Sequence, residues 1–330
     1  MYFVDNKGIT DPRINLAIEE YLLKTMDVEK DSFLLFYINE PSIIIGKNQN
    51  TAEEINTDYV DSNGIHVVRR LSGGGAVYHD LGNLNYSFIT VDDGNSFRNF
   101  RKFTEPVVQA LQSLGVDAEL SGRNDLMVAG RKISGNAQFS TRGRMFSHGT
   151  LMFDTEVDAV VSALKVSKEK IESKGIKSIR SRVANISEFL EEPMTVTEFR
   201  AAILNSLFEG EANVKYWELT DEDWANIHAL SAERYGNWDW NYGKSPKFNM
   251  KHSHRFPVGG IDVRLQVEGG AIKDANIYGD FFGVGDVEEI ERAITGIKYD
   301  RASLDAAISE FDIPKYLGGI TKEEFLKLIY

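Results

Sequence analysis

Apolar residues recur at helical spacing close to the start of the chain. Asp11 and Pro12 form an N-cap and first-turn pair ahead of this run. The apolar positions that follow at helical spacing are Ile14, Ala17, Ile18, Tyr21 and Leu22. The pattern predicts an N-terminal helix of about three turns. A second helical period covers residues 100–114.

Short runs rich in β-branched and aromatic residues predict strands. Phe33–Ile38 and Ser42–Ile45 are separated by the turn-forming residues 39–41, so we expect these two strands to pair with each other. Leu84–Thr90 alternates apolar and polar residues, as a half-buried strand does. Further strands are predicted at Leu126–Ala129, Ile133–Phe139 and Thr150–Phe153, with a tight turn around Gly130 between the first two.

The second half of the chain divides at a break in periodicity. Residues 157–235 are mostly helical in pattern, whereas Asn237–Lys247 has no period and contains Gly243 and Pro246, which favours a linker packed by its aromatic residues. Phe248–Gly283 then alternates like strands with glycine turns. Three predicted helices follow: Asp286–Thr295, Arg301–Glu310 and Thr321–Leu328. We therefore expect a large unit over residues 1–245 and a small α+β unit over residues 246–330.

Composition excludes several classes of protein. The 330 residues include no cysteine, which rules out disulfides, thiolate zinc sites and a cysteine nucleophile. A net charge of −13 argues against general nucleic-acid binding, which needs a surplus of Lys and Arg. No apolar run approaches the ~20 residues of a membrane span, and the first residues resemble no signal peptide, so we expect a cytoplasmic protein without a membrane partner.

A glycine-rich motif follows the apolar run Ile65–Val68. Residues 69–80 read R-R-L-S-G-G-G-A-V-Y-H-D. Three successive glycines permit positive φ and let backbone N–H groups approach an anion, and Arg70 would add a fixed donor fork for a phosphate. Taken alone, the motif also fits a flexible hairpin turn with two solvated arginines.

Two further segments carry basic residues in turns. Residues 130–135, G-R-K-I-S-G, place Lys132 where its ammonium could bind a phosphate or an oxyanion, although a hairpin lysine pointing to water fits equally. Asp125 lies just upstream as a candidate partner for magnesium or for an ammonium, and His148 lies downstream. Residues 174–186 hold four basic residues and fit either an anion-capturing loop or a solvated basic loop.

Taken together and in this order, these segments resemble the lipoate–protein ligase A family. The family pattern runs R-R-x-S-G-G-G-A-V-x-H-D, N-D-L, R-K-x-S-G, H-G-T-L and K-G-I-x-S-x-R-S-R-V-x-N, and all five segments are present. Residues 44–50, I-I-G-K-N-Q-N, also resemble a strand and turn of the family. The resemblance spans roughly residues 1–245.

The resemblance implies an α+β fold of the biotinyl/lipoyl ligase type. It predicts a catalytic domain over residues 1–245, with curved mixed β-sheets and outer helices, and a small α+β accessory domain over residues 246–330. The implied residues for ATP or an adenylate are Arg70, Ser72, Gly73, Gly74, Gly75, Ala76, Val77, Tyr78, Lys132, Lys174, Arg180 and Arg182. Those for lipoate are Lys132, Tyr37, Ile44, Ile45, Gly75 and His148. Lys132 is the implied catalytic residue, and Asp125 is the candidate magnesium ligand.

The implied activity has two steps. (R)-lipoate is activated by ATP with Mg²⁺ to lipoyl-AMP with release of pyrophosphate, and the lipoyl group then moves to the ε-amine of a lysine on a carrier domain. The expected carriers are lipoyl domains of 2-oxoacid dehydrogenase E2 subunits and the glycine cleavage H protein, and the enzyme is expected to be a monomer.

Other classes of protein share parts of this sequence pattern. An ATP-independent octanoyl- or lipoyl-transferase of the same superfamily would need a cysteine nucleophile, which this chain lacks. A biotin–protein ligase would carry a G-R-G-R-x-G-R loop, which is also missing. A non-catalytic lipoate or lipoyl-AMP sensor stays open, because a fold alone does not establish catalysis.

Overall fold

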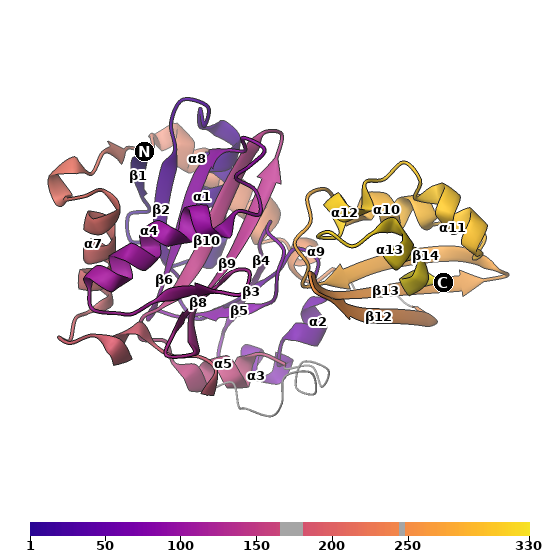
Figure 1. Cartoon of the computed structure of the whole chain (residues 1–330), viewed down its shortest axis with the longest axis horizontal. Helices are drawn as coiled ribbons and strands as arrows, with labels where there is room; N and C mark the ends of the chain where they lie inside the picture. Colours follow the sequence, from indigo (N-terminus) through magenta and orange to yellow (C-terminus); the bar gives the residue numbers. More distant parts are fainter. Residues whose placement is uncertain (166–180, 244–247) are drawn as a thin grey trace.

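The structure is a computed structural model that describes residues 1–165, 181–243 and 248–330. The larger part of the molecule holds two β-sheets and the smaller, C-terminal part holds a third (Figure 1). No helix in these ranges has the length and apolar character that crossing a membrane requires.

The main sheet has eight strands in the order β11-β1-β2-β6-β10-β9-β8-β7. Strand β1 pairs in parallel with β2 and β11, and the other pairs are antiparallel, so the sheet is mixed. The strands are β1 (Tyr2–Asp5), β2 (Phe33–Ile38), β6 (Asn83–Val91), β7 (Glu119–Ser121), β8 (Asp125–Val128), β9 (Arg131–Thr141), β10 (Arg144–Met152) and β11 (Tyr216–Trp217).

Helices cover both faces of this sheet (Figure 1). One face packs on α4 (Phe100–Ser113) and α7 (Val196–Leu207), and the other on α1 (Pro12–Thr25) and α8 (Asp221–Leu230). Strand β6 is therefore buried on both faces rather than on one, and the prediction of a half-buried strand was wrong. The alternation misled because the polar positions of β6, such as Asn85 and Ser87, are themselves buried under α1 and its neighbours.

A second, three-stranded sheet has the order β4-β3-β5. Strand β3 (Ser42–Ile45) pairs in parallel with β4 (His66–Arg69) and antiparallel with β5 (Val77–His79), not with β2. The predicted pairing of residues 33–38 with 42–45 was therefore wrong. Asn39 is fully buried, and its side chain contacts Asn15 of α1 and His79 of β5, so residues 39–41 carry the chain from one sheet to the next instead of turning it back.

Short helices complete the larger part and cover the second sheet. Residues of this sheet form a common apolar cluster with side chains at and beside these helices. They are α2 (Thr51–Glu54), α3 (Thr57–Ser62) and α5 (Val157–Ala163). The 3-10 turns η2 (Ile186–Phe189) and η3 (Glu211–Asn213) and the π-helical turn η4 (Ser231–Tyr235) also lie in the predicted helical region. That region contains strand β11 as well, which its pattern did not predict.

The predicted linker is partly helical and packed. Residues Trp238–Asn241 form α9, and residues 244–247 lie outside the described residues. Arg69 ties α9 to the second sheet: its backbone N–H donates to Asn241 Oδ1 (2.8 Å), and its guanidinium donates to the Trp240 carbonyl (2.9 Å). Arg69 is 1% exposed, and burial lowers its pKa to about 10. It is thus a structural arginine and not a solvated one.

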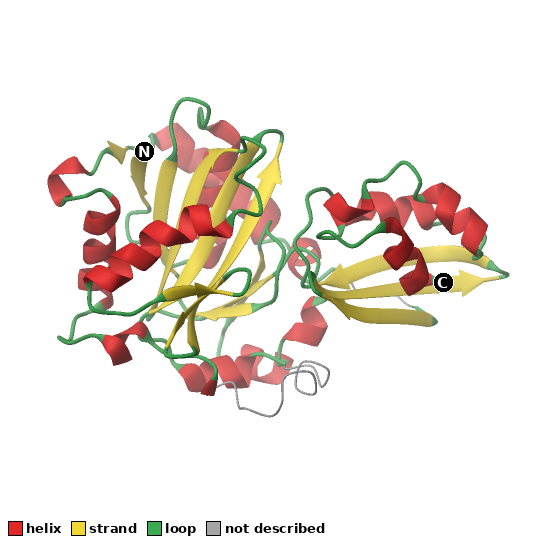
Figure 2. Ribbon diagram, in the orientation of Figure 1, coloured by secondary structure: helices red, strands yellow, loops and turns green. Residues whose placement is uncertain are grey.

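The C-terminal part is an antiparallel three-stranded sheet with helices on one face (Figures 1 and 2). The strands are β12 (Met250–Phe256), β13 (Gly259–Glu268) and β14 (Ala271–Gly279). The helices are α10 (Val287–Ile294), α11 (Arg301–Ala307), α12 (Ile313–Tyr316) and α13 (Lys322–Ile329). Its apolar residues form a core separate from those of the larger part. The sequence pattern missed α12, which is only four residues long.

Several polar contacts join the two parts. The Gly279 N–H donates to the Asn48 carbonyl (2.8 Å), and the buried Arg264 forms an ion pair with Glu53 (2.5 Å). Residues 281–282, which follow β14, lie against the glycine-rich loop: a Cβ on Gly73 would meet the Phe281 carbonyl oxygen at 2.4 Å. The C-terminal part therefore borders the glycine-rich loop directly.

Candidate active site

A cavity of about 140 Å³ lies between the second sheet and the main sheet. Its walls come from β2, β3, the glycine-rich loop, β9 and β10, and Phe282 of the C-terminal part also lines it. The predicted site residues that line it are Tyr37, Ile44, Arg70, Gly74, Gly75, Ala76, Val77, Lys132 and His148. The cavity thus joins segments that lie far apart in the sequence.

Some predicted residues lie elsewhere. Ile45 packs with Ile43 on the outer face of the second sheet, because alternate residues of β3 face opposite ways and Ile44 takes the cavity side. Tyr78 also packs on that outer face. The predictions that Ile45 contacts lipoate and Tyr78 the nucleotide therefore find no support in this geometry. Lys174 and Arg180 lie outside the described residues.

The glycine-rich loop is not a flexible hairpin, because β4 and β5 both pair with β3 and not with each other. Gly74 has φ +91°, a conformation that favours glycine. A Cβ on Gly46 would lie 1.9 Å from the Gly74 carbonyl oxygen, so both positions need glycine. Within the described part of the chain, the backbone N–H groups of Gly73, Gly74 and Gly75 have no hydrogen-bond acceptor. These donors suit an anionic ligand.

The Arg70 side chain fixes the glycine-rich loop through hydrogen bonds to backbone carbonyls. Its guanidinium donates to the carbonyls of Ile44 (2.9 Å), Gly73 (2.6 Å) and Gly75 (2.8 Å), and to Ser72 Oγ (2.9 Å). Burial lowers the pKa of Arg70 to about 10. The predicted solvated alternative for Arg70 is therefore wrong. Its hydrogen bonds fix the loop carbonyls, while its position in the cavity wall places a positive charge near a ligand.

A hydrogen-bonded chain leads from helix α1 to the loop. Ser72 Oγ lies 2.7 Å from His148 Nε2, and His148 Nδ1 lies 2.9 Å from Glu19 Oε1, all in buried surroundings. Arg70 Nε donates to Ser72 Oγ, and the His148 Nδ1–H donates to the Glu19 carboxylate, so the His148 ring bridges the loop and helix α1. The order is that of a nucleophile, base and orienting acid, but Ser72 is fully buried and does not line the cavity. These hydrogen bonds therefore position the glycine-rich loop and do not form a catalytic triad.

Glu19 should stabilise the fold through its hydrogen bond with His148. Gln at position 19 keeps the shape but removes the charge that receives the His148 N–H. We expect Glu19→Gln to lower the free energy of unfolding by about 2 kcal/mol in urea denaturation, because the buried hydrogen bond from His148 loses its charged acceptor. Glu105→Gln is the control: the Glu105 side chain is 44% exposed and forms a surface ion pair with Arg101, so its loss should cost under about 0.5 kcal/mol. Equal losses in the two variants would contradict this role for Glu19.

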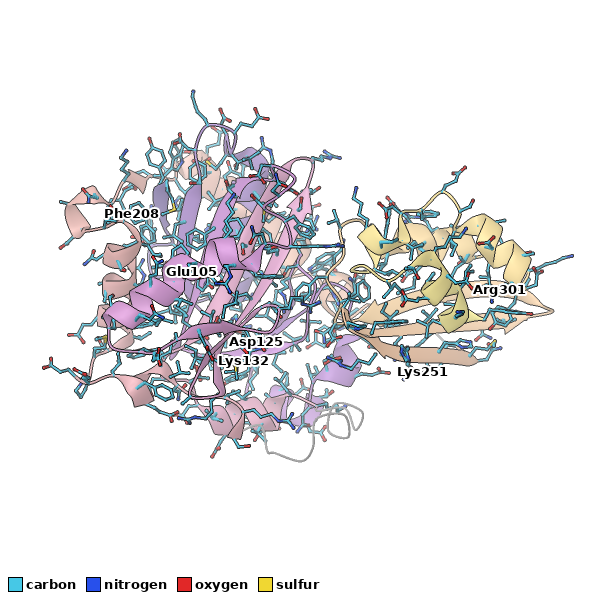
Figure 3. All side chains as sticks on the ribbon, in the orientation of Figure 1. Glu105, Asp125, Lys132, Phe208, Lys251 and Arg301 are labelled. Carbon is cyan, nitrogen blue, oxygen red and sulfur yellow. The ribbon has the colours of Figure 1, made fainter. Side chains whose placement is uncertain are left out.

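Lys132 and Asp125 face each other from neighbouring strands β9 and β8 (Figure 3). Lys132 Nζ lies 2.8 Å from Asp125 Oδ1, and the two side chains are 36% and 38% exposed. Gly135 leaves room beside the ammonium, since a Cβ there would lie 3.0 Å from Nζ. The ammonium thus sits at the rim of the cavity, held by a carboxylate, and does not simply point to water.

The backbone of Lys132 is bonded to the segment after residue 180. The Lys132 N–H donates to the Arg182 carbonyl (2.7 Å), and the Ala184 N–H donates to the Lys132 carbonyl (2.9 Å). The main chain of Arg182 therefore lies beside that of Lys132, although Arg182 does not line the cavity. Within residues 1–165, 181–243 and 248–330, no group of three or more His, Asp or Glu could hold a metal ion. Asp125 acts here as the partner of an ammonium.

His79 of β5 lines the cavity and is buried. Burial, with smaller contributions from Arg70 and His148, lowers its pKa to about 3, so the ring is neutral near pH 7. We expect its ring NMR signals to stay constant between about pH 8 and pH 5. Because the unfolded chain takes up this proton near the ordinary value of 6.5, stability should fall below that pH by up to about 1.4 kcal/mol per unit. Titration of His79 near its ordinary pKa would contradict the burial argument.

Comparison with known proteins agrees with this arrangement. The lipoyl protein ligase A/B catalytic domain family matches residues 11–208, and the bacterial lipoate protein ligase C-terminus family matches residues 245–329. Lipoate-protein ligase LplJ of Bacillus subtilis is 66% identical, and lipoate–protein ligase 1 of Staphylococcus aureus 56% identical, each with 100% of both chains covered. The chain belongs to the lipoate–protein ligase family.

Solved structures agree in fold. LipL1 of P. falciparum in complex with lipoate has a TM-score of 0.78 at 26% identity, covering 99% of this chain and 97% of its own. A lipoate-protein ligase A bound with ATP has a TM-score of 0.61 at 30% identity, covering 74% of this chain and 97% of its own. The predicted family and the predicted α+β fold of the biotinyl/lipoyl ligase type are confirmed.

Proposed function

We propose that the protein activates (R)-lipoate with ATP as lipoyl-AMP, releases pyrophosphate, and transfers the lipoyl group to a lysine ε-amine of a carrier domain. One observation carries the proposal: a single cavity combines unpaired glycine N–H donors, a lysine at its rim and apolar walls. An acyl chain with a carboxylate or phosphoanhydride head needs this combination. LipL1 bound to lipoate and ligase A bound with ATP supply the ligand classes.

In the first step, a lipoate carboxylate oxygen attacks the α-phosphorus of ATP, and pyrophosphate leaves. Positioning and neutralisation of charge dominate such transfers. Lys132 at the rim can contact the carboxylate and the α-phosphate together, and the N–H groups of residues 73–75 can bind phosphate oxygens. Asp125 holds the ammonium in place, and Arg70 fixes the loop.

In the second step, the carrier lysine amine attacks the carbonyl carbon of the mixed anhydride. The tetrahedral oxyanion forms next to Lys132, whose ammonium stabilises it, and AMP leaves as the amide forms. The amine loses its proton to solvent or to the departing phosphate. No protein nucleophile is needed, which agrees with the absence of cysteine.

Mg²⁺ would enter with the nucleotide and reduce repulsion between the phosphates. Asp125 is a single carboxylate already paired with Lys132, so it does not by itself form a cation site, and we assign no step through the metal. Its role as a magnesium ligand stays a prediction. So do the contributions of Lys174, Arg180 and Arg182 to the adenylate loop.

The proposed carriers are lipoyl domains of 2-oxoacid dehydrogenase E2 subunits and the glycine cleavage H protein. A bipartite lipoate protein ligase from Thermoplasma acidophilum, 32% identical with a TM-score of 0.64, was studied with its E2 lipoyl domain, which supports this class of acceptor. We further propose that residues 1–245 form the catalytic domain and 246–330 an accessory domain, in a monomeric cytoplasmic enzyme. The larger part holds the cavity except for Phe282.

Lipoate-dependent release of pyrophosphate tests the adenylation step. The protein with ATP, Mg²⁺ and lipoate should release pyrophosphate and accumulate lipoyl-AMP when no carrier is added. A lipoate or lipoyl-AMP sensor would bind these ligands without releasing pyrophosphate, and an acyl transferase would work equally well without ATP. Either result would overturn the proposed adenylation.

A further inference from the structure

Strand β9 carries an extra residue beside Lys132. Asp125 of β8 pairs with Gly135, but two residues further along β8 the partner is already Lys132, so Ile133 is left without a partner. Such a bulge reverses the alternation of side chains along the strand. Lys132 therefore lies on the same face as Asp125, where the ion pair forms. In a regular strand its side chain would point to the opposite face, which is buried in the apolar core.

Hydrogen bonds next to the bulge fix this pairing of β8 with β9. The Asn136 backbone N–H and its Nδ2 both donate to the Asn124 carbonyl (3.0 Å each), and Asn124 Nδ2 donates to the Asn136 carbonyl (2.6 Å). Asn136 Nδ2 also donates to Ser134 Oγ (3.2 Å), the residue that follows the bulge. A carbonyl only accepts, so the amide nitrogen of Asn136 must face Asn124. Its Oδ1 is then left for another donor.

That donor is Tyr86 of β6, whose hydroxyl donates to Asn136 Oδ1. Gly149 of β10 pairs with both residues and leaves room for this contact, because a Cβ there would lie 2.1 Å from Asn136 Oδ1 and 2.7 Å from the Tyr86 hydroxyl oxygen. Tyr86 is 1% exposed, packs in the apolar core and does not line the cavity. An effect of its hydroxyl on the reaction must therefore pass through Asn136.

We propose that Tyr86 and Asn136 are positioning residues that keep the bulge in place and so hold Lys132 at the reacting groups. The inference rests on the proposed function, in which Lys132 contacts the carboxylate and the α-phosphate. A displacement of about 1 Å can lower a rate up to a hundredfold, because charge that develops in the transition state needs a donor already in place. Binding of the substrates also uses the glycine N–H donors and the apolar walls, so it depends less on the bulge.

Tyr86→Phe removes only the hydroxyl and tests this role. We expect kcat for lipoate-dependent pyrophosphate release to fall about five- to twentyfold, with KM for lipoate and for ATP within about twofold of wild type. Tyr235→Phe is the matched control, because Tyr235 is also 1% exposed, donates through its hydroxyl to Glu20 Oε2 (2.7 Å) and does not line the cavity. Both variants lose a buried hydrogen bond and should unfold at lower urea concentration, but Tyr235→Phe should keep kcat within about twofold.

A double-mutant cycle separates positioning of Lys132 from a general loss of order. In a Lys132→Ala background, Tyr86→Phe should change the residual kcat by less than about twofold, because the group that it displaces is already gone. Asn136→Asp is a second variant that keeps the acceptor for Tyr86 but sets an oxygen against the Asn124 carbonyl. It should lower kcat at least as much as Tyr86→Phe, and again only when Lys132 is present. Since Asn136 borders the cavity, Tyr86→Phe is the primary test.

Three results would overturn the inference. Tyr86→Phe would keep the wild-type kcat, it would lower kcat by the same factor with and without Lys132, or Tyr235→Phe would lower kcat as much. In each case pyrophosphate release by the wild-type protein would leave the proposed function intact. A wild-type protein that releases no pyrophosphate would contradict the proposed function itself and this inference with it.

Discussion

Lys132→Ala is expected to slow lipoate-dependent pyrophosphate release by about a hundredfold or more. The ammonium is the only side-chain cation that lines the cavity at its rim among the described residues, where the carboxylate and the α-phosphate would meet. Its removal should cost little stability, about 0.5 kcal/mol, because the Lys132–Asp125 pair is partly exposed. A large loss of rate without a loss of folding is the signature of a group that acts on substrate.

Lys251→Ala is the matched control for that variant. Lys251 also forms a partly exposed ion pair, with Asp262 at 3.0 Å, but it lies on the C-terminal sheet (Figure 3). Pyrophosphate release should stay within about twofold of wild type, because a surface pair of this kind contributes little. If Lys132→Ala loses less than about fivefold in rate, Lys132 is not the group that stabilises the reacting charge.

Gly46→Ala is expected to abolish measurable nucleotide-dependent activity and to destabilise the fold by about 2–4 kcal/mol. The added Cβ would lie 1.9 Å from the Gly74 carbonyl oxygen and 3.0 Å from its carbon, so the glycine-rich loop must move. Arg70 holds the neighbouring carbonyls of Gly73 and Gly75, so movement of Gly74 disturbs the whole set of N–H donors. Pyrophosphate release and urea denaturation measure the two effects.

Gly236→Ala provides the comparison for this change. Gly236 has φ −87° and no atom closer than 3.4 Å to an added Cβ, and it does not line the cavity. Activity should remain near the wild-type level, with a stability change under about 1 kcal/mol. Wild-type activity in Gly46→Ala would show that the loop tolerates displacement and that its N–H groups are not needed in this geometry.

Local patterns predicted most helices and strands, but not how strands pair. The N-terminal helix and the strands around residues 33–38, 126–129 and 133–139 appear close to their predicted places. The pairing of residues 33–38 with 42–45 failed because turn-forming residues also occur where a chain crosses between sheets. The buried contacts of Asn39 with Asn15 and His79 decide which applies, and these contacts are invisible to local periodicity.

Site residues that belong to a sequence motif could be predicted. Site residues that only the fold brings close to the cavity could not. The glycine-rich loop and Lys132 were found because their residue types and spacing are unusual. Glu19 was missed because it lies within an ordinary amphipathic helix, and its partner His148 is 129 positions away. Ile45 was placed in the pocket because a strand pattern does not say which of its two faces is the cavity side.

The most direct test of the proposed activity is the intact mass of an apo lipoyl domain after incubation with the protein, ATP, Mg²⁺ and lipoate. The account predicts a gain of one lipoyl group that requires ATP, is lost in Lys132→Ala and is kept in Lys251→Ala. A gain that appears equally without ATP, or one that Lys132→Ala makes at the wild-type rate, would contradict it.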